Sequence, residues 1–245
     1  MHKAILQAHD LFKNLGIDYA ICGGFGLEMF AGRELRTHGD FDIAVFKEDR
    51  QKAVQFLLDN GWPTYGRYEE PGTIWQFLFY KINDITDPYW HDLPNTWSIQ
   101  PGFVPEMFKL DRLQRHLPAN ADPTTNTDVY SYKPTADWLV EDLGFIELAF
   151  DTREGNEYVA QANPRIARAM DKAILYRDGI PYLAPEIILF YKSGKGSMQG
   201  AYAKPRTEID FKAIMPLLCD ESKTWLLEAI NVTYPDGYEW LDGLI

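Results

Sequence analysis

Positive charge is scarce in this chain of 245 residues. Lys and Arg number 24 against 36 Asp and Glu, which gives a formal net charge of −12. Because neutralisation of phosphates by Lys and Arg supplies most of the affinity for nucleic acids, an RNA or DNA partner is not expected. An acidic surface instead attracts cationic molecules. The charge balance therefore favours small ligands over polyanions.

Long apolar runs and paired cysteines are missing as well. No apolar run reaches the roughly 18 residues that a membrane-spanning helix needs. The first residues, "MHKAILQAHDLFKNLGI", contain no continuous apolar segment with a small-residue cleavage site, so no signal peptide is expected. Cys22 and Cys219 are the two cysteines, and reduced thiols are expected rather than a disulfide. These features predict a cytoplasmic protein.

Apolar periodicity predicts an α/β or α+β core followed by a largely helical C-terminal third. The predicted helices are 3–15, 27–32, 49–61, 184–194, 207–218 and 220–230, and the predicted strands are 19–22, 41–46, 73–80, 144–151 and 156–162. Between about 83 and 136, Pro, Asp, Asn and Thr dominate, and a connection of this length is uncommon in compact domains. This segment is predicted to be an insertion, either a surface loop or a lid over a pocket.

Two aspartates interrupt an apolar strand in "GDFDIAVF". Asp40 and Asp42 are two residues apart, so their side chains project from the same face of the strand. Two neighbouring carboxylates repel each other unless a cation lies between them. A hard cation such as Mg²⁺ prefers oxygen ligands and pairs with phosphates. The pair therefore predicts a Mg²⁺ site.

A third carboxylate interrupts the apolar strand "GFIELAFD". Glu147 alone would indicate a solvated strand edge. If this strand lies beside the strand of Asp40 and Asp42, the three carboxylates form a cage on one face of the sheet. Two metal ions held about 4 Å apart by such a cage stabilise both the attacking and the leaving oxygen in phosphoryl transfer.

A glycine pair, Gly23 and Gly24, lies between a predicted strand and a helix start. Backbone N–H groups and the helix dipole favour phosphate at such a position. A dinucleotide fingerprint is excluded because its third glycine is replaced by Met29. The glycines therefore predict a phosphate contact of another kind.

Together these motifs resemble a known superfamily. "GGFGLEMFAGRELRTHGDFDIAVF" resembles the signature of the polymerase-β-type nucleotidyltransferases, and its long glycine-to-aspartate gap is similar to the aminoglycoside 2″-adenylyltransferase and lincosamide nucleotidyltransferase group. "GIPYLAPEIILFYKS", "EIDFKAIMPLL" and "WLLEAI" are similar to the same group, so the resemblance covers roughly 1–80 and 138–245. It implies an α+β fold: a core at 1–165 with a mixed sheet and flanking helices, interrupted at about 83–136, and a helical region at 166–245.

The resemblance also implies roles for individual residues. Gly23 and Gly24 would hold the triphosphate, and Asp40, Asp42 and Glu147 would be the metal-binding and catalytic carboxylates. Arg33, Arg36 and Lys192 would contact nucleotide phosphates. "KPRTEIDF" departs from the group's pattern, so Lys204, Arg206 and Asp210 receive no role. His38 is expected to orient the loop by hydrogen bonding, with metal ligation as the alternative.

The implied activity is Mg²⁺-dependent transfer of a nucleoside monophosphate to a hydroxyl of a small molecule, with release of pyrophosphate. Two Mg²⁺ ions and ATP as the triphosphate are expected, and the acceptor would be an aminoglycoside-like antibiotic. Two alternatives remain at this point. One is a toxin-like nucleotidyltransferase that modifies a protein or an RNA, and the other is an inactive nucleotide-binding protein of the same fold. The oligomeric state is left open.

Overall fold

The computed structural model describes residues 1–69, 77–86, 90–91, 93, 95–101, 111–112, 129–132, 143–194 and 203–235. The helices are α1 Lys3–Phe12, α2 Gly23–Ala31, α3 Arg50–Asp59, α4 Met170–Ala173, α5 Pro185–Lys192, α7 Ala203–Ile214 and α8 Asp220–Thr233, with a 3₁₀ helix at Met215–Leu217. The strands are β1 Tyr19–Ile21, β2 Asp42–Phe46, β3 Thr64–Glu69, β4 Phe77–Ile82, β5 Asn95–Ile99, β6 Asp111–Arg112, β7 Val129–Tyr132, β8 Phe145–Glu154, β9 Glu157–Val159, β10 Ala167–Ala169, β11 Ile174–Arg177 and β12 Ile180–Leu183.

The strands form one mixed sheet. Its order is β11-β12-β1-β2-β8-β5-β3-β4-β7-β6, with β9 attached to β8 and β10 attached to β9. β1 pairs with β12 in parallel and β2 pairs with β8 in parallel, whereas β1 and β2 are antiparallel. The predicted mixed sheet with flanking helices and the helices near the C-terminus are therefore confirmed.

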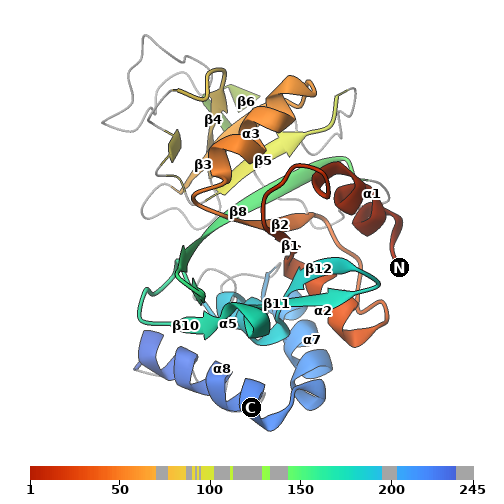
Figure 1. The fold of residues 1–245 in the computed structure, drawn as a ribbon, viewed down its shortest axis with the longest axis vertical. Helices are drawn as coiled ribbons and strands as arrows, with labels where there is room; N and C mark the ends of the chain where they lie inside the picture. The colour runs from red at the N-terminus through yellow and green to blue at the C-terminus, as the bar shows by residue number, and fades with distance from the viewer. Residues whose placement is uncertain are drawn as a thin grey trace.

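Helices cover both faces of the central strands (Figure 1). α1 and α3 pack on one face, where their apolar side chains meet those of β1, β2 and β8 in one buried cluster. α5, α7 and α8 pack on the opposite face in a second cluster. Because successive side chains of β2 point to opposite faces of the sheet, this strand contributes to both clusters. Ile43 and Val45 join the first, Ala44 and Phe46 join the second, and Asp42 projects on the side of the second. The face that carries Asp42 is thus the face covered by the C-terminal helices.

Several strands of this sheet lie where none was predicted, and β5 and β12 are the two that adjoin the central strands. β5 falls inside the expected insertion, yet it pairs with β8 along its whole length. β12 lies beyond residue 165 and pairs with β1. Both are short, and partners distant in the sequence hold them in the sheet, so local periodicity gave little signal. Residues 73–76 and most of 83–136 lie outside the described residues.

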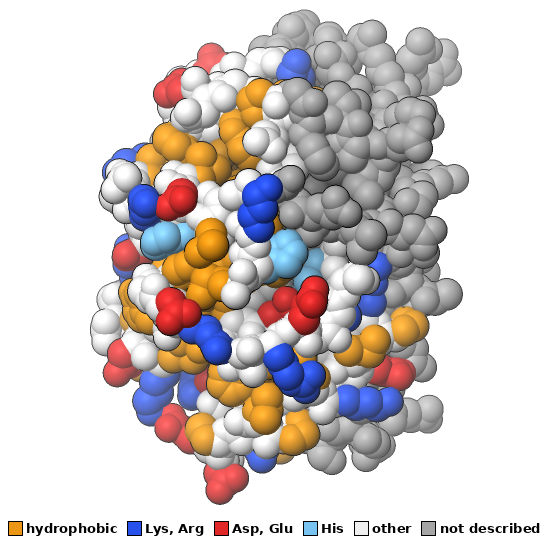
Figure 2. Space-filling view, turned by 90° about the vertical axis from the view of Figure 1, so that its right-hand side faces the viewer, with side chains coloured by type: hydrophobic (Ala, Val, Ile, Leu, Met, Phe, Trp, Pro, Cys, Tyr) orange, Lys and Arg blue, Asp and Glu red, His pale blue; other side chains and the backbone are white. Residues whose placement is uncertain are grey.

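The surface charges, the helix lengths and the cysteines bear on three of the sequence predictions. On the coloured part of the face in Figure 2, Lys and Arg side chains are dispersed among acidic and apolar ones and form no single basic surface. None of the described helices combines the length and apolarity that crossing a bilayer requires. Cys22 is buried and Cys219 is exposed, and both are free thiols, as expected.

Candidate active site

The glycine pair forms the first turn of α2, four residues before the predicted helix start. Cys22 precedes it in extended conformation and provides no side-chain cap for the helix. Gly23 has φ +58°, in the left-handed region that glycine tolerates. A Cβ atom there would lie 1.8 Å from Oδ2 of Asp42. Glycine is therefore required at this position, because the Asp42 carboxylate lies directly against the start of α2.

Gly24 gives a second close approach at the same helix end. A Cβ atom on Gly24 would lie 2.2 Å from Nδ1 of His38 and 3.1 Å from Nη2 of Arg36. The loop between α2 and β2 thus folds back over the N-terminus of the helix. As a result, Gly23, Gly24, Arg36 and Asp42, which the sequence singled out, lie together.

The parallel register of β2 and β8 places Glu147 beside Asp42. Asp42 and Glu147 are direct pairing partners, and parallel strands lie roughly 4.8 Å apart, so both carboxylates project from one face. Glu147 is buried and accepts a hydrogen bond from the amide of Asn95 on β5. The expectation that an adjacent strand carries Glu147 onto the face of Asp42 is confirmed.

The carboxylates provide part of a Mg²⁺ coordination shell. Among the described residues, no three His, Cys, Asp or Glu side chains are arranged to hold a metal by themselves, so the predicted three-carboxylate cage is not closed. Mg²⁺ in nucleotide enzymes is held by one or two carboxylates together with phosphate oxygens and water. Asp40 lies two residues before Asp42, the residue at which β2 begins to pair with β8. These two aspartates and Glu147 fit a cation that arrives with a triphosphate.

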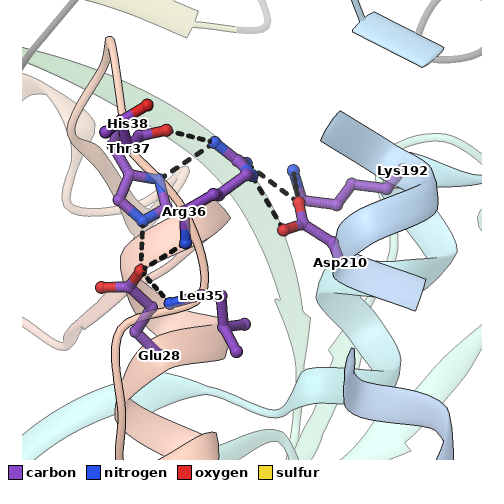
Figure 3. Close-up of polar contacts among 7 residues, drawn as sticks. All are labelled: Glu28, Leu35, Arg36, Thr37, His38, Lys192 and Asp210. Carbon is purple, nitrogen blue, oxygen red and sulfur yellow. Dashed lines mark hydrogen bonds and ion pairs between the residues drawn. The ribbon is translucent and has the colours of Figure 1, made fainter. Parts of the chain in front are cut away.

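Arg36 and Lys192 meet at a single carboxylate (Figure 3). Nε and Nη2 of Arg36 donate to the two oxygens of Asp210, each at 2.9 Å, and Nζ of Lys192 lies 3.0 Å from Oδ2. Burial alone would lower the pKa of Arg36, but its hydrogen bonds to Asp210 and the charges of Asp210, Asp40 and Asp42 raise it. The guanidinium therefore stays charged, within the electrostatic influence of both predicted metal ligands.

Glu28 fixes the loop that carries Arg36. Its Oε1 accepts from the backbone N–H of Leu35 at 2.8 Å and from that of Arg36 at 3.4 Å, and it lies 2.7 Å from Nε2 of His38. Nδ1 of His38 lies 3.2 Å from Nη1 of Arg36, and the ring packs on Phe25. His38 thus orients the loop by hydrogen bonding, as the first of its two predicted roles required.

Replacing Glu28 with glutamine is expected to destabilise the fold by about 1–3 kcal/mol at pH 7, because it weakens hydrogen bonds that close the loop. Burial would raise the pKa of Glu28, but bonds from His38 and Leu35 lower it below its usual value. A lowered folded-state pKa gives stability that is complete above the unfolded value of about 4.3 and is lost as the pH falls through the folded value.

The contribution of Glu28 to stability is measured by urea unfolding of the wild type and of Glu28→Gln, at pH 7 and in more acidic buffers. The difference in unfolding free energy should shrink below about pH 4. Glu154→Gln, an exposed position with the same change of charge, serves as the control. A difference that stays constant over this pH range would contradict the assigned role of Glu28.

A second buried carboxyl lies behind the site, on the same face of β8. Asp151 accepts from the hydroxyl of Tyr191 at 2.6 Å, and Tyr191 in turn accepts from the backbone N–H of Gln161 and from the hydroxyl of Tyr158. Burial raises the pKa of Asp151. This network fixes α5 against β8 one residue before Lys192, and so it helps to place the Lys192 side chain.

Arg33 lines a pocket beside Glu28. It follows Gly32 at the C-terminal end of α2 and lines a pocket of about 390 Å³ together with Arg177, Asp178 and the N-terminal residues Met1 and His2. Glu28 is therefore common to this pocket and to the contacts of the Arg36 loop. A phosphate-binding role for Arg33 stays a prediction.

Three positioning residues were not among the predicted site residues. Asn95 lies in the segment treated as an insertion, and Glu28 lies within an apolar helix. Asp210 lies in "EIDF", where the departure from the expected pattern left it without a role. A charged residue inside an apolar helix was the available signal at Glu28, since such a group requires a partner. Asp210 lies in a helix with several other charged residues, so it gave no such signal.

Residues 4–69 match the model of the aminoglycoside-2″-adenylyltransferase family. A lincosamide resistance protein from Staphylococcus haemolyticus is 33% identical over 60 residues, which are 24% of this chain and 37% of that protein. The chain therefore spans well under half of the length of that relative. These matches confirm, for the N-terminal segment, the predicted resemblance to the aminoglycoside and lincosamide nucleotidyltransferase group.

Two solved structures are similar over most of the chain. The crystal structure of the lincosamide antibiotic adenylyltransferase LnuA with lincomycin bound is 16% identical, and the alignment covers 89% of this chain and 98% of that one with a TM-score of 0.44. The crystal structure of ANT(2″)-Ia in complex with adenylyl-2″-tobramycin is 12% identical and covers 94% of each chain with a TM-score of 0.45.

Proposed function

We propose that this protein is a Mg²⁺-dependent nucleotidyltransferase that moves a nucleoside monophosphate from a nucleoside triphosphate, ATP first among them, to a hydroxyl of a small antibiotic. The observation that carries the proposal is that Asp42 lies beside two other residues that the sequence predicted for the site. Glu147 is its register partner, and Gly23 at the start of α2 lies against its carboxylate. Gly23 and Asp42 lie within the segment that matches the family model.

Phosphate binding is assigned to the start of α2. The N–H groups of the first helical turn have no intrahelical acceptor, and Cys22 supplies no cap, so this end of the helix favours an anion. Arg36 lies against Gly24 at the same end. The triphosphate would therefore lie between the helix N-terminus and the two cations Arg36 and Lys192.

The three carboxylates have two proposed roles, which are cation binding and deprotonation of the acceptor. Asp40 and Asp42 would hold Mg²⁺, which supplies neutralisation of the phosphate charge. Glu147 would receive the proton of the acceptor hydroxyl. The hydroxyl oxygen forms a bond to the α-phosphorus, the bond from the α-phosphorus to the bridging oxygen of the β-phosphate breaks, and pyrophosphate leaves. Asn95 would hold Glu147 in place through its hydrogen bond.

The acceptor class follows from charge and from the relatives. The family model describes an aminoglycoside-modifying enzyme, and the relative from Staphylococcus is named for lincosamide resistance. Both antibiotic classes carry hydroxyl groups and basic nitrogen, which suits a chain with a net charge of −12. A nucleic-acid acceptor is disfavoured by the same charge.

A transfer assay tests the proposal. Purified protein is incubated with Mg²⁺, with one of four α-labelled nucleoside triphosphates, and with a panel of aminoglycosides and lincosamides. Label on an antibiotic, dependent on Mg²⁺, is the expected result. Label on a polypeptide after incubation in cell lysate would replace the antibiotic by a protein acceptor. Nucleotide binding without any transfer would identify an inactive nucleotide-binding protein.

A further inference from the structure

Asp210 on α7 is a buried carboxylate that joins three separate parts of the chain. It is fully shielded from solvent, and its partners are Arg36, from the loop before β2, and Lys192, from the last turn of α5. Burial would raise its pKa, but the charges and hydrogen bonds of Lys192 and Arg36 lower it. Asp210 is therefore ionised, and it balances one of the two positive charges that it holds.

The position of Arg36 decides what this contact does. Nη2 lies over Gly24 at the start of α2, and the remaining bonds of the guanidinium go to the carbonyl of Thr37 at 3.1 Å and to His38. Asp40 and Asp42 act on the same guanidinium through their charges. Without Asp210, the charges of these two carboxylates would still attract a largely shielded Arg36, since a charge removed from water requires a partner.

We propose that Asp210 is a positioning residue of the nucleotide site. It holds Arg36 and Lys192 beside the N-terminus of α2 and keeps the guanidinium of Arg36 from pairing with Asp40 and Asp42, so that Arg36 does not compete with a divalent cation for these two carboxylates. The proposal rests on the proposed function. It also makes α7 part of the active site, through the contact of Asp210 with the two cations.

The test compares cation affinities of matched variants. Mn²⁺ binding is measured by electron paramagnetic resonance without nucleotide, and binding of a non-hydrolysable ATP analogue with Mn²⁺ is measured separately. Asp210→Asn keeps the size of the side chain and removes its charge. Glu208→Gln removes one charge from the same helix, at a carboxylate 3.8 Å from Lys212. Asp210→Asn should weaken Mn²⁺ affinity about tenfold, the scale of one charge-assisted hydrogen bond, and Glu208→Gln should change it less than about twofold.

A second variant separates positioning from general damage to the fold. Arg36→Gln combined with Asp210→Asn removes the guanidinium that would compete with the cation. This double variant should recover most of the Mn²⁺ affinity lost in Asp210→Asn, although its affinity for the triphosphate should stay low. A purely structural role for Asp210 predicts no recovery, because the contact between α7 and the loop is absent in both variants.

The outcomes also distinguish this inference from the function on which it rests. If the wild type shows no Mn²⁺-dependent nucleotide binding, the proposed function fails and the role of Asp210 fails with it. If the wild type binds and Asp210→Asn matches Glu208→Gln, or if the double variant shows no recovery, the inference alone is overturned. Loss in Asp210→Asn together with recovery in the double variant supports it.

Discussion

Replacing Gly23 with alanine is expected to lower transfer activity about 100-fold or more, because a displacement of about 1 Å in a reacting site has effects of this size. The new Cβ would lie 1.8 Å from Oδ2 of Asp42, so the carboxylate or the start of α2 must move. The left-handed φ of +58° adds about 1–2 kcal/mol of backbone strain. The measurements are kcat/KM in the transfer assay and the free energy of unfolding in urea.

Gly155 provides a matched control for this substitution. Its φ is +60°, yet nothing lies within 4 Å of the Cβ that alanine would add. Gly155→Ala should therefore carry the same backbone strain and leave transfer activity within about twofold of the wild type. Equal losses of activity in the two variants would show that the contact between Gly23 and Asp42 has no part in the reaction.

Replacing Asp42 with asparagine is expected to abolish most transfer, by about 1000-fold or more, because metal-assisted charge stabilisation contributes several kcal/mol to such reactions. The free energy of unfolding should rise or stay unchanged. Asp42 is the register partner of Glu147, and removing one of two neighbouring carboxylates removes their repulsion. Loss of activity without loss of stability distinguishes a functional carboxylate from a structural one.

Asp10→Asn is the control for the change of charge. Asp10 is exposed and pairs with Lys13 on the surface of the protein, 2.6 Å away. Transfer rates and urea unfolding are measured for both variants and the wild type. Retained activity in Asp42→Asn would remove this residue from the reaction, and loss of activity that accompanies unfolding would assign it to the fold.

The parts of the site predicted from the sequence are those with a local signal. Asp40 and Asp42 stand out because charges interrupt an apolar strand, and Gly23 and Gly24 stand out because they separate a strand from a helix. The placement of Glu147 beside Asp42 needed only the assumption that two apolar strands are neighbours, and the register confirms it.

The parts that were missed depend on contacts between distant residues. Asp210 and Arg36 are 174 positions apart, so no periodicity links them. β5 is a strand because β8 pairs with it, although its own sequence lies in a stretch rich in turn-forming residues. Helix α2 begins at Gly23 rather than near Leu27, because the N–H of Gly26 already bonds to the carbonyl of Cys22 despite the low helix propensity of glycine.

The most direct test of the account is a crystal structure with Mn²⁺ and a non-hydrolysable nucleoside triphosphate, in which anomalous scattering locates the metal. The account predicts Mn²⁺ on the carboxylates of Asp40 and Asp42, beside Glu147, with the triphosphate on the N–H groups of Gly23 and Gly24. A nucleotide bound elsewhere, as in the pocket that Arg33 lines, with no Mn²⁺ at these carboxylates, would contradict it.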